Sequence, residues 1–499
     1  MIVPLLGVLL LGALFMIMPE QSQLMLARIR AFLGDDLGVY YIVIGLLAFC
    51  VTMFMAFSKY GKIKLGNIDK PQYSSFTWGA MIFTATMAAD ILFYSLCEWA
   101  LYALEPRVME LGDMQLWAST FPLFHWGPIA WSFYIVLAVA FGFIIHVRLR
   151  GKQKFSEACR ALLGKKVDGP LGKAIDLIAV FALIAGTATT FSLATPLLSS
   201  AIASVFNIGA TMGLTIAILL LIALIYTIAV LTGMAGISKL AGVCVFAFSA
   251  MLLYFLFFGG QTRYILETGV AALGNLTQNF IGLATFTDPL RDSSFPQNWT
   301  IFYWAYWMAW CVATPFFIGM ISKGRTIKNT VIGGYAWGLA GTFTSFIILG
   351  NYGLAQQMRN GLDLAGEIAG GADISETIIA IFNTLPLPAL GLIMLCICMI
   401  LFYATTFDAL TMVISSYSHK ELKPGEEPDK RIRTYWAMLL IMLPIALIFS
   451  ENSLSSLQSV SIIAAFPIGI VITIIVASFF KDAKKYLEER KNNTRTGLD

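Results

Sequence analysis

The sequence predicts an all-α polytopic membrane protein with twelve transmembrane helices. Of its 499 residues, 58% are hydrophobic and only 12% are charged, and the mean hydropathy is +0.78. A chain of this composition has too few polar side chains to cover a water-soluble fold. The second observation is a series of apolar stretches of about 20 residues, the length that a helix needs to cross the hydrocarbon layer.

Twelve such stretches follow one another along the chain. They lie near residues 2–18, 38–57, 76–104, 120–147, 174–206, 211–232, 237–258, 299–321, 328–350, 386–419, 431–449 and 457–480. The first stretch has neither a basic segment before it nor a small-residue cleavage site after it. We therefore expect a retained span rather than a signal peptide.

Basic residues follow the even-numbered spans, and this pattern predicts the orientation. Examples are Lys62, Arg148, Lys323, Lys423 and Lys484, which follow spans two, four, eight, ten and twelve. Because cytoplasmic loops carry the excess of Lys and Arg, both termini are expected in the cytoplasm and the protein in the plasma (inner) membrane, in contact with the lipid bilayer. The formal net charge of +4 indicates no nucleic-acid partner.

An aromatic segment in the eighth span points to a bound cation. Residues Trp299 to Trp310 read Trp-Thr-Ile-Phe-Tyr-Trp-Ala-Tyr-Trp-Met-Ala-Trp. Ring faces attract a cation that has no hydrogen-bond donors, such as a trimethylammonium group. Interfacial aromatic belts are the alternative interpretation, but Trp307 and Trp310 lie roughly 12–17 Å into the span at about 1.5 Å per residue, deeper than such belts.

A second aromatic group opens the fourth span. Trp131 and Tyr134 are three residues apart and share a helix face, while Trp126 precedes the break at Gly127 and Pro128. Two spans are therefore predicted to present aromatic side chains to one site.

Four carboxylates lie inside predicted spans, where an ionisable residue usually faces a partner or a cavity. Glu98 and Asp176 lie near span ends and are interpreted as structural or interfacial, while Asp90 and Asp408 lie deeper. Asp90 follows a run of small residues. It is interpreted as a counterion for a bound cation, as a proton carrier, or as a hydrogen-bonded packing residue.

These motifs resemble the betaine/choline/carnitine transporter family. The aromatic span followed by Ile321-Ser-Lys-Gly-Arg325 is similar to the family's signature span and loop, and Phe124-His-Trp-Gly-Pro128 is similar to its fourth span. The resemblance covers nearly the whole chain. It implies a secondary transporter of a quaternary ammonium compound, with a LeuT-like core of two inverted five-helix repeats.

The same resemblance implies a domain organisation, and relatives are commonly homotrimers. The expected parts are two peripheral N-terminal helices, a first repeat, an extracellular interfacial segment, a second repeat and a short cytoplasmic tail, at 1–75, 76–258, 259–298, 299–480 and 481–499.

The resemblance also implies the substrate-binding residues. The family's ring cage matches Trp126, Trp131, Tyr134, Trp307 and Trp310. Three further residues complete the predicted site, namely Met87, Asp90 and Tyr306, the last of which replaces a frequent Trp.

The third span departs from the family's sodium-coupled betaine carriers. They have Gly-Met-Gly-Ile-Gly where this chain has Thr-Met-Ala-Ala-Asp at 86–90, so we expect an easily unwound backbone to be missing here. Proton-coupled choline carriers are more similar, because they also end this motif in Asp. Betaine and carnitine bring their own carboxylate, whereas choline needs one from the protein, so Asp90 favours choline.

Other couplings remain open, and no cofactor is expected beyond a coupling ion, H⁺ or Na⁺. Thr405 and Thr406 match a Thr-Ser pair that helps bind sodium in the family, although such hydroxyls also bond their own helix. Ion-independent exchangers of carnitine or betaine have a Met where this chain has Thr314, and a basic residue where it has Ser238 beside Lys239. The dispersed histidines provide no enzyme site.

Overall fold

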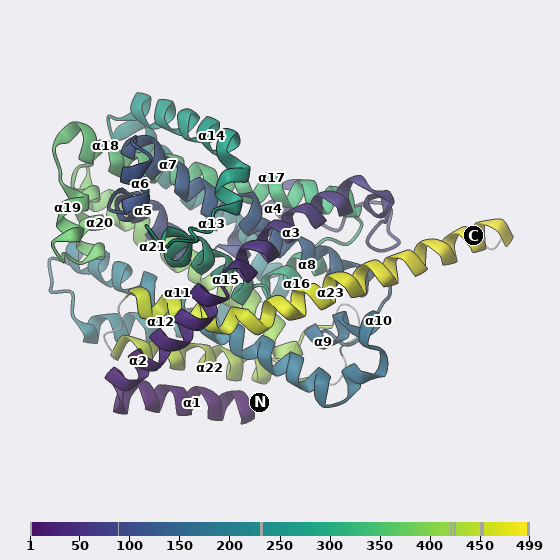
Figure 1. The fold of residues 1–499 in the computed structure, drawn as a ribbon. Coiled ribbons are helices and arrows are strands. Elements are labelled where there is room, and N and C mark those ends of the chain that lie inside the picture. The colour runs from purple at the N-terminus through teal and green to yellow at the C-terminus, as the bar shows by residue number, and fades with distance from the viewer. Residues whose placement is uncertain are drawn as a thin grey trace.

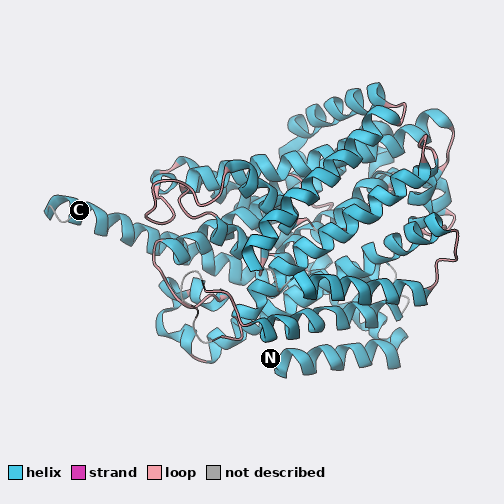
Figure 2. Cartoon of the chain, turned by 180° about the vertical axis from the view of Figure 1, so that it is seen from behind, coloured by secondary structure: helices cyan, strands magenta, loops and turns pink. Residues whose placement is uncertain are grey.

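The computed structural model describes residues 2–87, 89–229, 233–419, 422, 426–449 and 454–496. These residues form helices joined by loops (Figure 2), and the one β-bridge among them, between Lys64 and Thr326, belongs to no strand. The all-α prediction is confirmed.

Seven helices in the described part of the chain are long and apolar enough to cross a membrane, or nine when two bent pairs are each counted as one span. The long spans are carried by α3 (Val39–Phe57), α7 and α8 (Met114–His125 and Pro128–His146), α11 (Pro170–Phe206), α13 (Gly233–Phe258), α17 (Ile327–Ser345) with its extension to Asn360, α21 (Pro388–Ser416) and α23 (Leu454–Thr496). The three other predicted spans fall on α1 (Ile2–Ile17), α12 (Met212–Ala229) and α22 (Lys430–Phe449). Within the described residues these helices are not counted among the candidate spans, so the count of twelve stays a prediction.

Further helical elements, most of them short, connect or extend these helices. They are α2 (Pro19–Arg30), η1 (Ala31–Asp36), η2 (Lys59–Lys62), α6 (Pro106–Glu110), α9 (Phe155–Ala158), α10 (Arg160–Leu163), η3 (Gly164–Asp168), α14 (Thr262–Thr285), η5 (Pro296–Thr300), η6 (Phe346–Gly350), α18 (Asn351–Asn360), α19 (Leu364–Ala369) and α20 (Ile374–Asn383). The segment predicted to lie at the outer interface is thus mostly the 24-residue helix α14, which packs against α7 and α18 (Figure 1).

Two spans are broken in the middle. In the third, α4 (Ser75–Thr86) and α5 (Asp90–Ala103) meet at 67°, and in the eighth, η5 and α15 (Ile301–Trp310) meet α16 (Thr314–Ile321) at 54°. Broken helices at matching positions of two halves are typical of transporter sites, where freed backbone groups line the site.

The expectation that the third span lacks an easily unwound backbone is wrong. Its helix ends at Thr86 without a glycine, and the hydroxyls of Thr405 and Thr406 donate to the carbonyls of Thr84 and Met87 beside the break. The Thr86 hydroxyl donates to the carbonyls of Ile82 and Phe83, at 2.8 and 3.0 Å, and such back-bonding loosens a helix. Asp90 then sits in the first turn of α5, where a negative charge is favourable. Ala88, in the same motif, lies outside the described residues.

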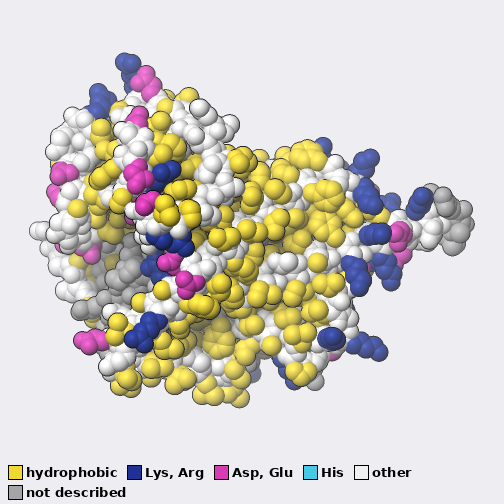
Figure 3. Space-filling model, viewed as in Figure 1, with side chains coloured by type: hydrophobic (Ala, Val, Ile, Leu, Met, Phe, Trp, Pro, Cys, Tyr) yellow, Lys and Arg dark blue, Asp and Glu magenta, His cyan; other side chains and the backbone are white. Residues whose placement is uncertain are grey.

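The two ends of the bundle differ in charge. Figure 3 shows an apolar band across the molecule and basic side chains at the end from which α23 projects, whereas acidic and basic side chains mix at the opposite end. At the basic end, Arg148 and Arg150 bind Asp482 of α23, at 2.8 and 2.7 Å, and Arg148 also binds Glu489. These ion pairs hold the loop after α8 against the last helix.

A buried ion pair joins α21 to α22. The Asp408 carboxylate, deep in its span as predicted, lies 2.5 Å from the Arg433 guanidinium, and both side chains are no more than 1% exposed. A charge buried this deeply needs its partner, because desolvation of a single ion costs several kcal/mol.

Replacing Arg433 with Met should therefore destabilise the protein by about 3–5 kcal/mol, because Asp408 would be left buried and unpaired. Adding Asp408→Asn to the same variant should recover most of that loss. Thermal unfolding of the purified protein, monitored by size-exclusion chromatography after heating, measures both effects. Arg263→Met, at an exposed position, is the control. Equal stability of the single and double variants would contradict this role.

Candidate substrate site

Four of the five predicted cage rings meet at the centre of the bundle. Trp307 on α15 lies 4.6 Å from Tyr134, 5.4 Å from Trp131 and 5.9 Å from Trp126, measured between ring centroids. All four side chains are buried. We call these residues the ring cluster.

Local structure sets the orientation of two of these rings. Trp126 directly follows α7, just before the Gly127–Pro128 break, and its indole N–H donates to the Glu98 carboxylate at 2.9 Å. The Trp131 indole lies against Gly338 of α17, at a position where any Cβ would collide with the ring. A side chain larger than Gly at 338 would therefore displace Trp131.

The ring cluster is closed in this conformation. Trp307 contacts three neighbouring rings directly, whereas a cation must lie over ring faces, within about 6 Å of their centroids. Binding of a trimethylammonium group between these rings therefore requires Trp307 to move apart from at least one of them.

Trp310, the fifth predicted ring, belongs to a second group. Its ring contacts Tyr306 and Phe407, each at 6.4 Å between centroids, and Phe407 in turn stacks on Phe191 at 4.2 Å. No ring contact joins Trp310 to the ring cluster among the described residues. The predicted rings are thus divided between two neighbouring groups.

Asp90 lies between these two groups. The hydroxyl of Tyr306 donates to its carboxylate and is itself hydrogen-bonded to Thr190 of α11. Tyr134 of the ring cluster and Tyr403 near Phe407 both lie within range of its charge. Among the described residues no Lys or Arg forms an ion pair with Asp90. Its negative charge therefore faces aromatic side chains that could hold a cation.

The predicted sodium ligands meet the break in the third span. The Thr406 hydroxyl lies 2.9 Å from the carbonyl oxygen of Thr84 and 3.2 Å from that of Met87, while the Thr405 hydroxyl lies 3.3 Å from Thr84. Met87, predicted to contact substrate, thus places its carbonyl in this group. Four oxygens gather here, a ligand type that suits a hard cation.

Several buried donors near the rings have no partner in the described part of the chain. They are the indole N–H groups of Trp131, Trp307 and Trp310 and the hydroxyl of Thr314. Buried donors are rarely left unpaired except at functional sites. They are able to bind oxygen atoms of a ligand held by the rings.

The remaining predicted carboxylates have structural partners. Asp176 accepts hydrogen bonds from the backbone N–H and the hydroxyl of Ser156, at 2.9 and 3.0 Å. Glu98 is fully buried and orients Trp126, a role that its place near a span end did not reveal. Only the four-residue spacing from Glu98 to Tyr102, on one helix face, hinted at a polar cluster.

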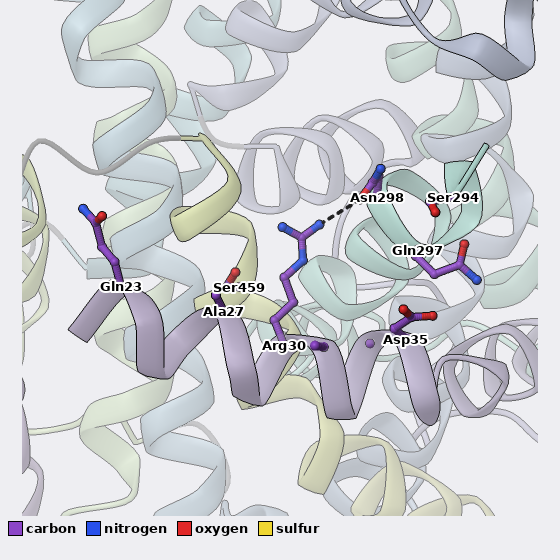
Figure 4. A pocket seen from close by; sticks show the side chains of 10 residues that line it. Gln23, Ala27, Arg30, Asp35, Ser294, Gln297, Asn298 and Ser459 are labelled. Atoms are coloured by element: carbon purple, nitrogen blue, oxygen red, sulfur yellow. Dashed lines mark hydrogen bonds between the residues drawn. The ribbon is translucent and has the colours of Figure 1, made fainter. Parts of the chain in front are cut away.

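Three of the cavities among the described residues bear on access to the site, and none of them is lined by a predicted site residue. The first, of about 320 Å³, lies between the ends of α8, α16 and α21 and includes His146, Phe316 and Met412. A second, of about 190 Å³, lies at the opposite end and includes Thr300. A third, of about 310 Å³, lies between α2, η1 and η5, where Arg30 reaches Asn298 (Figure 4); it contains none of the predicted site residues.

Comparison with known proteins identifies the family of this chain. The family model described as the betaine/carnitine/choline family transporter matches residues 1–488. A probable glycine betaine transporter of Desulfitobacterium hafniense is 31% identical, over 93% of each chain. The high-affinity choline transport protein of Escherichia coli K12 is 27% identical, over 96% of this chain and 71% of its own.

Among solved structures, a Na⁺-coupled sialic acid symporter in a substrate-bound outward-open state aligns with 90% of this chain and 86% of its own, with 13% identity and a TM-score of 0.43. So distant a likeness leaves the inverted-repeat architecture a prediction. The match of the family model covers nearly the whole chain. The chain therefore belongs to the betaine/carnitine/choline transporter family, whose members are membrane transporters of small quaternary ammonium compounds and not enzymes.

Proposed function

We propose that this protein transports choline, or a close quaternary ammonium relative, across the plasma (inner) membrane by alternating access coupled to protons. The observation that carries the proposal is the place of Asp90. It is a buried carboxylate at the break of the third span, between the ring cluster and the Trp310 group. The rings supply cation–π attraction and Asp90 supplies the charge.

The charge on Asp90 favours choline over zwitterionic relatives. Betaine and carnitine carry their own carboxylate, which would lie in the same low-dielectric site and be repelled by Asp90. Choline has no carboxylate, so the attraction between Asp90 and the ammonium offsets part of the desolvation of both groups. The unpartnered indole N–H groups suit the hydroxyl oxygen of choline.

The cavities and broken spans support alternating access. The 320 Å³ cavity at the basic end is lined by His146, twelve residues after Tyr134 on α8. At about 1.5 Å per residue, it lies roughly 18 Å from the ring cluster. The two broken spans are the first spans of the predicted repeats 76–258 and 299–480, as expected for a LeuT-like core.

The basic side chains at the end from which α23 projects support cytoplasmic termini. The homotrimer remains a proposal from family resemblance.

Sodium-coupled betaine import is the second candidate. The oxygens of Thr84, Met87, Thr405 and Thr406 favour it, because they meet at a helix break. The three indole N–H donors also suit a carboxylate. An exchanger has less support, because Lys239 is exposed and Thr314 places a hydroxyl where exchangers have a sulfur.

Replacing Thr406 with Val separates these two candidates, because it removes one oxygen at constant shape. We expect choline uptake driven by a proton gradient to continue, and a sodium gradient to have no effect on the parent protein. Radiolabelled uptake into proteoliposomes measures both. Sodium-driven betaine uptake that is lost in the variant would favour the second candidate.

Replacing Trp307 with Leu should abolish saturable uptake, because this ring contacts the three other rings of the cluster. Folding should be retained, as judged by a symmetric size-exclusion peak. Trp337→Leu, outside both ring groups, is the matched control. Unchanged uptake by the Trp307 variant would remove the ring cluster from the site.

Replacing Asp90 with Asn should raise the KM for choline by about tenfold or more, the equivalent of 1.4 kcal/mol of lost attraction. Binding of betaine should be unchanged or improved, because the repulsion disappears. Competition of each compound against radiolabelled choline measures the two effects, with the loop residue Asp363→Asn as control. An equal loss for both compounds would show that Asp90 acts structurally.

A further inference from the structure

A chain of hydrogen bonds lies beside the ring cluster and has no place in the scheme above. It begins at the Thr300 hydroxyl, 3.0 Å from His125 Nε2. His125 Nδ1 lies 2.5 Å from the Tyr102 hydroxyl, which lies 2.5 Å from Glu98 Oε1. The chain ends at Trp126, whose indole N–H donates to Glu98 Oε2 at 2.9 Å.

Three segments bring these groups together. Glu98 and Tyr102 lie one turn apart on α5, His125 ends α7, and Thr300 ends η5 at the start of the broken eighth span. All four are buried, with at most 4% exposure. The His125 ring stacks on Tyr303 at 4.9 Å, so it is held in the plane that both contacts require.

The hydrogen-bond series begins at a cavity and ends at the ring cluster. Thr300 lines the 190 Å³ cavity at the end opposite the basic one, where Thr300, Arg107 and Asn279 are the polar residues of a mostly apolar lining. Glu98 lies against Trp126 of the ring cluster. The hydrogen bonds therefore connect an outer cavity with the proposed substrate site.

Glu98 has no basic partner among the described residues. The ionisable groups around it are Tyr94 and Cys97 on α5, Tyr102 and His125, and Tyr303 on α15. Glu105, the next carboxylate along the chain, is bound to the indole N–H of Trp299. A buried carboxylate without a cation is costly inside a membrane and commonly marks a proton pathway.

The hydrogen bonds from Thr300 to Glu98 can all point in either of two opposite directions. When Glu98 is ionised, Tyr102 donates to it, His125 Nδ1–H donates to Tyr102, and Thr300 donates to Nε2. When Glu98 is protonated, it donates to Tyr102, Tyr102 donates to Nδ1, and Nε2–H donates to Thr300. Every donor and acceptor is used in both directions, so conversion needs no movement of heavy atoms.

We propose that Thr300, His125, Tyr102 and Glu98 form a proton relay that delivers the coupling proton from the outer cavity to the carboxylate beside Trp126. This inference rests on the proton-coupled transport proposed above. It assigns the proton to Glu98 and leaves Asp90 as the charge that binds the cation.

The transfer balances along the chain. A proton from water in the outer cavity adds to the Thr300 oxygen, and the original hydroxyl proton moves to His125 Nε2. The Nδ1 proton moves to Tyr102, and the Tyr102 proton moves to Glu98 Oε1. One proton leaves water and one arrives at Glu98, while the three intermediate groups keep their proton number.

Protonation of Glu98 also acts on the ring cluster. The ionised carboxylate holds Trp126 by a charge-assisted hydrogen bond, which is about twice as strong as a neutral one. A protonated Glu98 therefore holds Trp126 less firmly against Trp307. Since the cluster must open to admit a cation, the proton makes opening easier and thereby links the two fluxes.

Tyr102→Phe tests the relay, because it removes the one hydroxyl between His125 and Glu98 and leaves the ring and the Glu98–Trp126 bond in place. In proteoliposomes loaded with a pH-sensitive dye, uptake driven by an acidic exterior and choline-induced proton entry should each fall by about 100-fold, the scale of a lost proton-transfer group. Choline–choline counterflow, which needs no net proton movement, should stay close to the parent rate. Tyr335→Phe is the matched control. The buried Tyr335 hydroxyl contacts Thr52 and takes no part in the relay.

The outcomes separate the relay from the proposed function. A parent protein that moves choline without protons overturns the proton coupling and the relay with it. A proton-coupled parent whose Tyr102→Phe variant keeps its proton flux, or loses counterflow in equal measure, overturns the relay alone.

A second variant, Glu98→Gln, keeps an oxygen for Trp126 but cannot carry the proton. Choline binding measured by tryptophan fluorescence should become independent of pH in this variant while the parent remains pH-dependent. Equal pH dependence of the two proteins would also overturn the relay.

Discussion

The hydrogen bond from Tyr306 to Asp90 is the contact on which the arrangement of the site depends. Asp90 begins the second half of the broken third span, and Tyr306 belongs to the aromatic half of the broken eighth span. One bond thus joins the two broken spans and fixes a carboxylate between two aromatic groups. The hydroxyl of Tyr306 is what makes this bond.

Composition and periodicity were sufficient to predict the helical membrane fold and the two aromatic segments. Trp126, Trp131, Tyr134 and Trp307 were assigned to one site from sequence, and the structure brings these four rings together. Spacing shows which rings share a face of one helix, whereas the grouping of rings from two spans came from the family resemblance, and their role in binding stays a prediction. The comparisons confirm the family but do not test these assignments.

Contacts between segments far apart in the sequence could not be predicted from composition or residue spacing. The break at Thr86 forms without glycine, at a place where the Thr406 hydroxyl of α21 bonds the carbonyls of Thr84 and Met87. Trp310 shares its spacing with Trp307 but faces Phe407, a residue almost one hundred positions away in the sequence. The link from Glu98 through Tyr102 to His125 likewise depends on how α5 and α7 pack.

The central claim is that a quaternary ammonium group binds within the ring cluster and that these rings separate to admit it. A cryo-EM structure of the protein with choline in lipid nanodiscs tests it directly. The account predicts density for the trimethylammonium group among Trp126, Trp131, Tyr134 and Trp307, with Trp307 moved away from at least one neighbour. Choline bound elsewhere, with these four rings still in contact, would contradict it.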